Sequence, residues 1–288
     1  MEKLILGTVQ MGLNYGINNS FGKISTTESQ KILIKAFSSG VTTLDTAESY
    51  GTSHQVIGKF HKNNPNYKFE IVTKVPHDIE LDSIKTRVKE YLEVLGVNSL
   101  EVLMFHSFDS FQNNYKAIHS LVELKLKGLI KHLGVSVYTN DQLEKLLNED
   151  LITVVQLPFN MLDNINVRGD LLNQLKKKGK LIHTRSAFLQ GLFFKNTNDK
   201  TLVVQKLKPE LERLNQIILE SNCSMEELAL SYCLIQENID NVIIGVDSRV
   251  QLNESLKASS YEIGQDIIKL INDIEVKDLD LLNPSLWK

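Results

Sequence analysis

Thr-Leu-Asp-Thr-Ala-Glu-Ser-Tyr, residues 43–50, is the stretch from which the fold can be worked out. A short apolar run, Val41–Leu44, ends on Asp45, and Tyr50 follows five positions later. This pattern is typical of a buried strand that ends in a carboxylate, followed by a loop that carries a phenol. A buried carboxylate without a partner is costly, so Asp45 needs a cation nearby.

Two other apolar runs also end in a polar residue. The run that starts at residue 69 ends in Lys74, and the run that starts at residue 100 ends in His106. Strands that carry Asp45, Lys74 and His106 to one rim would place groups that exchange protons around one pocket. Together with Tyr50, the sequence therefore predicts a proton-transfer site at that rim.

Composition restricts the class of protein. The chain has 288 residues, and α/β barrels use about 250 residues in one domain. Apolar residues make up 42% and charged residues 23%, as in an ordinary globular protein. The net charge of −3 provides no basic field for nucleic acid. Because the two cysteines fit no zinc spacing and there is no signal peptide or long apolar run, we expect a cytoplasmic protein without a metal or a membrane segment.

Strand-like runs alternate with amphipathic segments along the chain. The strand-like runs are Leu4–Thr8, Val41–Asp45, Phe69–Lys74, Leu100–His106, Ile130–Ser136, Thr153–Leu157, Lys180–Arg185 and Asn241–Val246. The helical segments lie near residues 26–39, 82–95, 112–127, 140–148, 167–178, 201–221 and 224–237. Capping-box pairs are Ser25 with Glu28, Thr139 with Gln142, Ser224 with Glu227 and Ser248 with Gln251. Glycines that suit helix C-caps are Gly40, Gly96, Gly128 and Gly179.

This alternation implies a parallel sheet. Eight strand–helix units predict a closed (β/α)8 TIM barrel, an α/β fold, as a single domain over residues 1–288. The alternative is an open doubly wound sheet, which usually carries a Gly-rich phosphate-binding turn after its first strand. Residues 7–12 do not fit that motif, so the barrel is favoured. Barrel active sites lie at the C-terminal ends of strands. The polar residues expected there are Asp45, Lys74, His106, Ser136, Gln156 and Arg185.

At this point the sequence resembles the aldo-keto reductase family. The resemblance runs from about residue 4 to residue 256 and rests on an ordered set of short motifs. These are Leu6-Gly7-Thr8, Leu44-Asp45-Thr46-Ala47, Tyr50-Gly51, Val72-Thr73-Lys74, Leu103-Met104-Phe105-His106, Gly134-Val135-Ser136 and Val155-Gln156. The resemblance implies an NAD(P)H-dependent oxidoreductase that reduces an aldehyde or ketone. A small or sugar-derived aldehyde is one candidate substrate.

The family's catalytic tetrad falls on Asp45, Tyr50, Lys74 and His106. Reduction of a carbonyl needs a hydride on carbon and a proton on oxygen, and a phenol of pKa about 10 is a weak acid at neutral pH. We expect the Lys74 ammonium to lower the pKa of Tyr50, the proton donor. Asp45 would keep Lys74 charged, and His106 would orient the substrate oxygen or Tyr50.

The resemblance also implies a nicotinamide cofactor, NADPH or NADH. Ser136 and Gln156 match residues that hold the carboxamide in this family, whereas Val137 stands where Asn is usual. Arg185 stands where an aromatic residue often stacks on the nicotinamide, and a guanidinium plane can also stack. The predicted cofactor-binding residues are Gly7, Thr8, Ser136, Gln156, Arg185, Gly245, Ser248, Arg249 and Gln251.

The loop after the eighth strand carries the family's phosphate site. Ser248 is predicted to cap a helix whose N–H groups favour an anion, and Gly245 lets the backbone approach closely. Family members that prefer NADPH tend to have basic residues here and an Asn near the adenine. This chain has Asp247 instead, which only Arg249 offsets, and Ser255 in place of the Asn. We predict a weakened preference for NADPH, with NADH or dual use.

Other residues near the predicted rim are weaker candidates. His54 is interpreted as structural. Five residues could line a substrate pocket, although we expect each of them to face solvent: Asn14, Tyr15, His77, Phe108 and Asn160.

Two other functions remain open. The departures at the cofactor end are compatible with a regulatory subunit that senses a nicotinamide cofactor with little turnover. The same acid and base groups could also serve a barrel isomerase or lyase that uses no hydride. The sequence identifies neither the substrate nor the oligomeric state.

Overall fold

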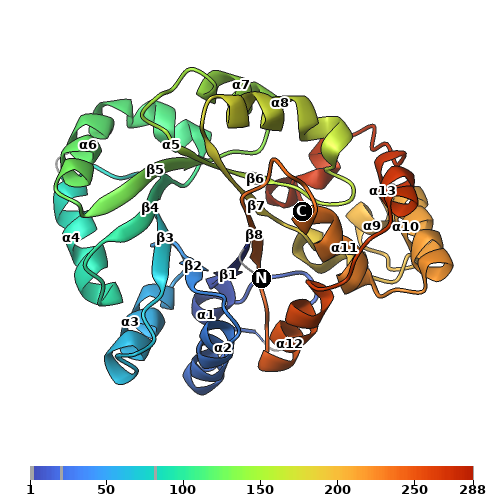
Figure 1. Cartoon of the computed structure of the whole chain (residues 1–288), viewed down its shortest axis with the longest axis horizontal. Coiled ribbons are helices and arrows are strands. Elements are labelled where there is room, and N and C mark those ends of the chain that lie inside the picture. The colour runs from blue at the N-terminus through green and yellow to red at the C-terminus, as the bar shows by residue number, and fades with distance from the viewer. Residues whose placement is uncertain (1–2, 20–21, 81–82, 288) are drawn as a thin grey trace.

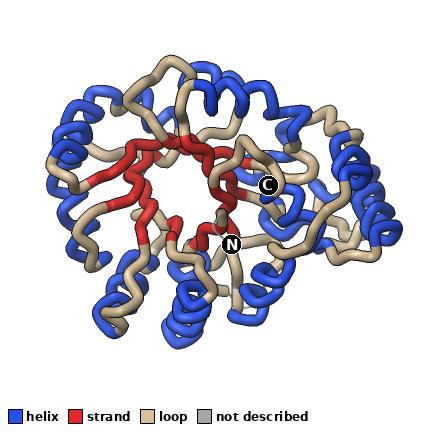
Figure 2. Tube along the Cα trace, in the orientation of Figure 1, coloured by secondary structure: helices blue, strands red, loops and turns tan. Residues whose placement is uncertain are grey.

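In the computed structural model, which describes residues 3–19, 22–80 and 83–287, eight parallel strands close into a barrel in chain order. Figures 1 and 2 show the strands as an inner ring with helices around it. The strands are β1 (Leu4–Gly7), β2 (Thr43–Asp45), β3 (Glu70–Val75), β4 (Leu100–Phe105), β5 (Ile130–Ser136), β6 (Val154–Pro158), β7 (Leu181–Arg185) and β8 (Asn241–Ile244). The predicted (β/α)8 barrel is confirmed.

Closure comes from the two neighbours of β1. Leu6 pairs with Leu44 on β2 and with Ile244 on β8, so the first strand joins the second to the last. An open doubly wound sheet would leave two unpaired edges, and that alternative is wrong. Since all eight strands run in parallel, their C-terminal ends gather at one rim.

The helices pack around the outside of the ring. They are α1 (Val9–Gly12), α2 (Thr26–Ser38), α3 (Ser53–Asn63), α4 (Ile84–Leu95), α5 (Phe108–Asn113), α6 (Ile118–Leu126), α7 (Asn140–Leu146), α8 (Ile165–Lys177), α9 (Leu202–Lys206), α10 (Lys208–Ser221), α11 (Met225–Leu234), α12 (Arg249–Ala258) and α13 (Gln265–Asn272). Short 3-10 turns are η2 (Tyr115–Ala117), η3 (Leu189–Phe194), η4 (Leu279–Leu282) and η5 (Pro284–Leu286). The sequence pattern did not predict α3, which directly follows the Tyr50 loop.

The predicted helix caps are formed to different degrees. Thr139 and Ser224 make complete capping boxes with Gln142 and Glu227. Ser25 accepts a hydrogen bond from the Glu28 N–H, but the Glu28 carboxylate bonds elsewhere in the fold. The predicted C-cap glycines all have positive φ: Gly40, Gly96, Gly128 and Gly179.

Two hydrophobic clusters hold the barrel. The large cluster joins the outer faces of the strands to the helices and includes Leu44, Phe60 and Leu103. The small cluster is Val72, Val102, Met104 and Val154. Because residues two apart share a face of a strand, Val72 points the same way as Lys74, into the barrel. This small apolar cluster thus lies inside the barrel, beneath the polar rim.

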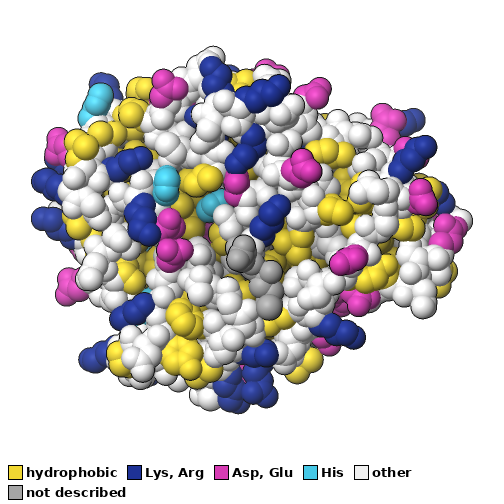
Figure 3. Space-filling model, in the orientation of Figure 1, with side chains coloured by type: hydrophobic (Ala, Val, Ile, Leu, Met, Phe, Trp, Pro, Cys, Tyr) yellow, Lys and Arg dark blue, Asp and Glu magenta, His cyan; other side chains and the backbone are white. Residues whose placement is uncertain are grey.

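Charged side chains of both signs are interspersed over the face drawn in Figure 3. This mixture agrees with the small net charge of −3. None of the helices in the described ranges has the length and apolar character needed to cross a membrane.

Candidate active site

The end of β2 and the end of β3 hold a buried ion pair. Lys74 Nζ lies 2.6 Å from Asp45 Oδ1 and also donates to the Thr46 carbonyl at 3.0 Å. The side chains are only 1% and 5% exposed, so water does not screen this pair. Burial lowers the pKa of Lys74, and Asp45 opposes that shift. The carboxylate therefore keeps the ammonium charged in an environment that would otherwise neutralise it.

The second oxygen of Asp45 is also bonded. Gln156 Nε2 donates to Asp45 Oδ2 at 2.8 Å, across 111 residues of sequence. With both carboxylate oxygens held, Asp45 has one orientation. Gln156 was predicted to hold the nicotinamide carboxamide; it lines the cavity, and in this structure its amide nitrogen also orients Asp45.

The backbone under Tyr50 is fixed by a group of small hydroxyl residues. Thr8 Oγ1 donates to the Asp45 carbonyl at 3.0 Å, and Ser53 Oγ donates to Thr8 Oγ1 at 2.8 Å. Ser53 Oγ also lies 3.0 Å from Thr46 Oγ1. All three hydroxyl residues are buried, so these bonds tie the first turn of α3 to β1 and β2.

A close backbone contact sets how near the Tyr50 loop lies to α1. A side-chain carbon on Gly12 would lie 1.7 Å from the Tyr50 carbonyl oxygen, so only glycine allows α1 to approach the loop. Gly51, with φ of 57°, turns the chain directly after Tyr50. Gly12 is a positioning residue that the sequence pattern did not identify as such.

Tyr50 stands between Lys74 and His106. Lys74 Nζ lies 5.2 Å from the centre of the Tyr50 ring, and the Tyr50 and His106 rings meet edge-to-face with centres 5.9 Å apart. The four tetrad residues come from three strand ends and one loop. The structure therefore gathers the carboxylate, ammonium, phenol and imidazole at one point of the rim.

The pKa of Tyr50 shifts in the direction opposite to our prediction. Removal of the phenol from water raises its pKa, and the Asp45 carboxylate raises it further. Since Asp45 neutralises Lys74, the ammonium contributes little net positive field at the phenol. The group that lowers the pKa of Tyr50 is the Arg185 guanidinium. The expectation that Lys74 lowers this pKa is corrected accordingly.

His106 is a neutral imidazole. Burial, then the nearby Lys74 ammonium, lowers its pKa to about 3. Its Nδ1 lies 3.2 Å from Ser49 Oγ, and its ring stacks on His77 with centres 5.1 Å apart. Since Nδ1 is engaged with Ser49, Nε2 is the ring nitrogen left for a substrate oxygen.

A cavity of about 330 Å³ opens beside Tyr50 and extends toward the start of α12. Its lining includes the predicted residues Gly7, Thr8, Asp45, Tyr50, Gln156, Arg185, Gly245 and Gln251. Lys74 and His106 do not line it, but they contact the lining residues Asp45 and Tyr50. Two of the four candidate catalytic residues, Asp45 and Tyr50, thus share one continuous space with candidate cofactor groups.

The far part of this cavity presents acceptors that lack donors. Gln10 Oε1 and Asp247 Oδ1 are buried, and neither has a hydrogen-bond partner among the described residues. A side-chain carbon on Gly245 would lie 2.6 Å from Gln10 Nε2, so a larger residue there would displace the Gln10 side chain. Unpaired buried acceptors are costly, and a ligand with hydroxyl or amide donors would satisfy them. The ribose and carboxamide groups of a nicotinamide dinucleotide fit that requirement.

The N-terminus of α12 is capped on two sides. Ser248 Oγ accepts from the Gln251 N–H at 3.2 Å, and Gln251 Oε1 accepts from the Asp247 N–H at 2.7 Å. The Arg249 N–H donates to Glu28 Oε1 at 3.1 Å, and that bond is the main reason that the pKa of Glu28 is lowered. A carboxylate of this chain thus takes one N–H that the sequence assigned to phosphate.

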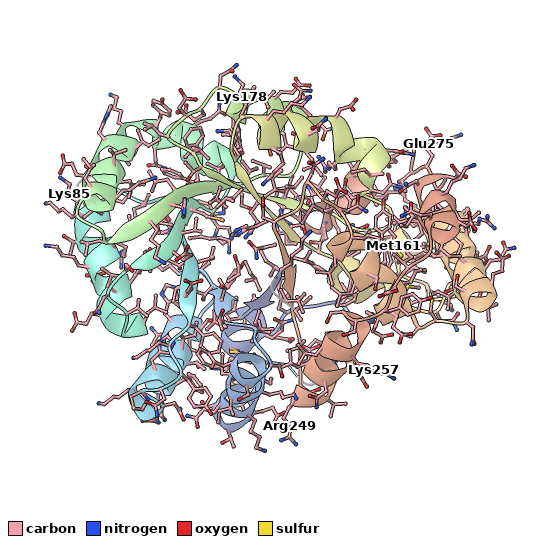
Figure 4. The ribbon with its side chains drawn as sticks, in the orientation of Figure 1. Lys85, Met161, Lys178, Arg249, Lys257 and Glu275 are labelled. Atoms are coloured by element: carbon pink, nitrogen blue, oxygen red, sulfur yellow. The ribbon has the colours of Figure 1, made fainter. Side chains whose placement is uncertain are left out.

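Three predicted cofactor residues lie outside the cavity lining. Ser136 is buried at the end of β5, and Ser248 is engaged in the α12 cap. Arg249 is exposed and lies at the outer edge of the molecule, at the start of α12, in Figure 4. In this conformation its side chain does not offset the charge of Asp247.

The weaker candidates separate into two groups. Tyr15 lines the cavity and its hydroxyl accepts from Gln190 Nε2 at 2.6 Å, while His77 and Asn14 are exposed. Phe108 and Asn160 are 4% and 0% exposed, so the expectation that they face solvent is wrong. His54 is buried against Thr73, with its Nε2 2.9 Å from Oγ1, as a structural residue would be.

The Aldo/keto reductase family model matches residues 3–276. The chain belongs to this family. Among curated proteins, the aldo-keto reductase described here is 23% identical over 287 residues to L-glyceraldehyde 3-phosphate reductase of Escherichia coli K12, covering 85% of this chain and 83% of the relative. It is 21% identical over 275 residues to NADH-specific methylglyoxal reductase of the same strain, covering 80% and 82%.

Solved structures share the fold of this aldo-keto reductase. The holo form of the aldo-keto reductase AKR11C1 from Bacillus halodurans superposes with a TM-score of 0.79 at 19% identity, over 96% of this chain and 94% of that chain. The glycerol dehydrogenase AKR11B4 from Gluconobacter oxydans gives 0.75 at 18% identity, over 94% and 90%. At these identities the similarity concerns the barrel itself.

Proposed function

We propose that this oxidoreductase reduces the carbonyl group of a small aldehyde or ketone to an alcohol, with a nicotinamide cofactor as hydride source. One observation carries the proposal: a buried, fully bonded Asp45–Lys74 pair lies beside Tyr50, which lines the cavity together with Asp45 and contacts the His106 ring edge-to-face. An isolated structural ion pair would need neither a phenol at the cavity wall nor a neutral imidazole behind it.

Each residue has a distinct part in the proposed reaction. The bound cofactor supplies a hydride to the carbonyl carbon. Tyr50 donates its proton to the carbonyl oxygen, and the neutral His106 orients that oxygen through Nε2. Lys74 holds a fixed charge 5.2 Å from the Tyr50 ring centre, and Asp45, held by Gln156, fixes Lys74. The small carbonyl substrate enters by the open side of the cavity.

The test is a panel of aldehydes and ketones assayed with NADH and NADPH at 340 nm. Consumption of reduced cofactor that depends on the carbonyl compound, and that Tyr50→Phe abolishes, is the expected result. Tight cofactor binding with no turnover across the panel would favour the cofactor-sensing alternative. Conversion of a substrate without any nicotinamide would favour the isomerase or lyase alternative.

We also propose that the preference for NADPH is weakened, so that the enzyme uses NADH or both cofactors. The cavity beyond Gly245 is lined by the carboxylates of Glu226, Asp247 and Glu254, and Glu28 bonds the first N–H of α12. A 2′-phosphate there would meet negative charge, whereas an unmodified ribose would offer hydroxyl donors to the unpaired Asp247 Oδ1. Dissociation constants from nicotinamide fluorescence test this. NADPH binding a hundredfold tighter than NADH would refute it.

The remaining assignments rest on the sequence. We propose that the chain acts as one catalytic domain over residues 1–288 and works in the cytoplasm. Fractionation and limited proteolysis of the native protein would test both assignments.

A further inference from the structure

Arg185 brings an unneutralised positive charge into the cavity. It ends β7 and lines the cavity together with Tyr50. Its guanidinium lies 4.2 Å from the centre of the Tyr138 ring and donates to the Val137 carbonyl at 3.3 Å and to Ser186 Oγ at 3.5 Å. All of these partners are neutral. None of the ion pairs between described residues includes Arg185.

The other cation beside Tyr50 is in a different state. Lys74 is matched at 2.6 Å by the Asp45 carboxylate, so the pair is neutral overall. At Tyr50 the charge of Lys74 is offset by the adjacent Asp45 carboxylate, which raises the pKa of the phenol, whereas no ion-pair partner in the described part of the chain offsets the Arg185 guanidinium. Of the two cations, Arg185 therefore has the larger net effect on a charge that forms at Tyr50.

Charged and titratable groups from several elements lie around Tyr50 and could compete with Arg185 for an effect on its charge. Groups that face it are Tyr15 from the loop after β1, Asp45 from β2, Lys74 from β3, His106 from the end of β4, Tyr138 from the loop after β5 and Arg185 from β7. Burial raises the pKa of Tyr15 to about 12 and lowers the pKa of His106 to about 3, so neither adds a charge near neutral pH. The carboxylate opposes ionisation of Tyr50, and the guanidinium favours it.

We propose that Arg185 stabilises the phenolate that remains on Tyr50 after proton transfer, acting through Tyr50 and not through the substrate. The inference rests on the proposed function. In the reduction, the hydride carries two electrons to the carbonyl carbon, the C=O π bond opens onto oxygen, and the Tyr50 O–H bond breaks as its proton forms the alcohol O–H. The negative charge left on Tyr50 Oη is the charge that Arg185 stabilises, until solvent returns a proton.

Two departures from the family pattern are linked by this role. Val137 replaces an amide-bearing residue, and its backbone carbonyl accepts a hydrogen bond from the guanidinium. The next residue, Tyr138, makes a cation–π contact with Arg185, whose guanidinium carbon lies 4.2 Å from the ring centre. An aromatic residue at position 185 could stack on a ring but would carry no charge.

The central experiment measures the electrostatic effect without turnover. Tyr50→Cys introduces an acid that, like a phenol, ionises to an anion, and the pKa of its thiol is read from the pH dependence of iodoacetamide alkylation by peptide mass spectrometry. We expect Arg185→Gln in this background to raise that pKa by about one unit, and Arg185→Lys to return it most of the way. Arg213→Gln on α10 is the matched loss of a remote guanidinium and should leave the pKa unchanged.

A second readout uses the enzyme with Tyr50 intact. Alcohol oxidation needs the phenolate as base, so Arg185→Gln should move the rising limb of its pH–rate profile upward by about one unit, and Arg185→Lys should restore it. A thiol pKa that stays within about 0.3 unit after Arg185→Gln would overturn the electrostatic claim. A shifted thiol with an unmoved pH–rate profile would overturn the catalytic role. Because the thiol titration needs neither cofactor nor substrate, its failure is distinct from failure of the proposed reduction.

Discussion

The polar groups at the two ends of the cavity differ in whether their hydrogen bonds are satisfied within the protein. At the Tyr50 end, both oxygens of Asp45 are bonded, and Lys74 donates to two oxygens. At the α12 end, Gln10 Oε1 and Asp247 Oδ1 are buried without partners within the described ranges. The hydrogen bonds of Asp45 and Lys74 are complete in the protein alone, whereas the two acceptors at the other end lack donors in the part of the chain that the structure describes.

This difference matches what each end would do in the proposed reaction. Proton transfer needs groups that are fixed before the substrate arrives, because reorganisation during the reaction raises the barrier. A cofactor that comes and goes has to gain hydrogen bonds when it binds, so its site retains unmet acceptors. The difference is open to test at both ends of the cavity.

Loss of the phenol oxygen is expected to have the largest effect. Tyr50→Phe removes the proton donor and should lower kcat/KM by on the order of 10² to 10⁴, because general acid catalysis contributes about that much. Stopped-flow or steady-state assays at 340 nm measure kcat/KM. The urea midpoint for unfolding of this variant should stay close to that of the parent protein. Near-full turnover by this variant would falsify the assignment of Tyr50.

Breaking the ion pair tests whether the Tyr50 end depends on complete bonding. Lys74→Met leaves the Asp45 carboxylate buried without a cation, which should lower the free energy of unfolding by about 3–5 kcal/mol in urea titrations. The control is Lys85→Met, since Lys85 lies 2.6 Å from Glu123 on the outside of the molecule (Figure 4) and should cost about 0.5 kcal/mol. Equal losses for the two variants would contradict the comparison.

Buried imidazoles predict a loss of stability in mild acid. Burial lowers the pKa of His183 to about 4, while an unfolded imidazole titrates near about 6.5. Between these two pH values the unfolded chain binds a proton that the native chain does not bind. The free energy of unfolding therefore falls as pH decreases through this window. His183 alone should account for about 3 kcal/mol at pH of about 4. Urea titrations from neutral to acid pH measure the slope, and His183→Asn should flatten it. An unchanged slope in that variant would assign the acid sensitivity to other groups.

Changes at the α12 end should be the smallest and should separate the two cofactors. Asp247→Asn removes the unpaired carboxylate, and we expect NADPH to bind about tenfold tighter while NADH changes little. Glu28→Gln should act in the same direction by withdrawing negative charge from the first N–H of α12. Fluorescence titrations with both cofactors measure these constants, and Glu123→Gln on α6 is the remote control. Parallel changes for NADH and NADPH would mean that neither carboxylate discriminates between them.

The residues at the strand ends show how much of the candidate site could be predicted from the sequence. Asp45, Lys74, His106 and Tyr50 were predicted to share a rim because alternating strands and helices imply parallel strands with a common C-terminal side. The barrel places them there. The helix α3 was missed from the sequence; its N-cap residue Thr52 makes no side-chain cap bond, and the side chain of its first residue, Ser53, bonds inward to Thr8.

Several contacts of the site could not be predicted from the sequence. The Glu28 carboxylate matched a local capping box, yet it bonds to the Arg249 N–H, 221 residues away. Gln156 was assigned to the cofactor, and its bond to Asp45, 111 residues away, was not foreseen. The acidity of Tyr50 was attributed to Lys74, and the opposite net shift of its pKa follows first from burial of the phenol and then from the Asp45 carboxylate.

The amino-acid sequence by itself determined the alternation of strands and helices, the glycine caps and the identity of the four residues at the reactive rim. These depend on periodicity and on neighbours within a few positions along the chain. Only the tertiary structure decided which charges cancel, which acceptors stay unpaired and why Arg185, not Lys74, carries the free positive charge beside Tyr50. Those outcomes depend on distances between side chains far apart in sequence, and electrostatic energies change steeply with such distances and with burial.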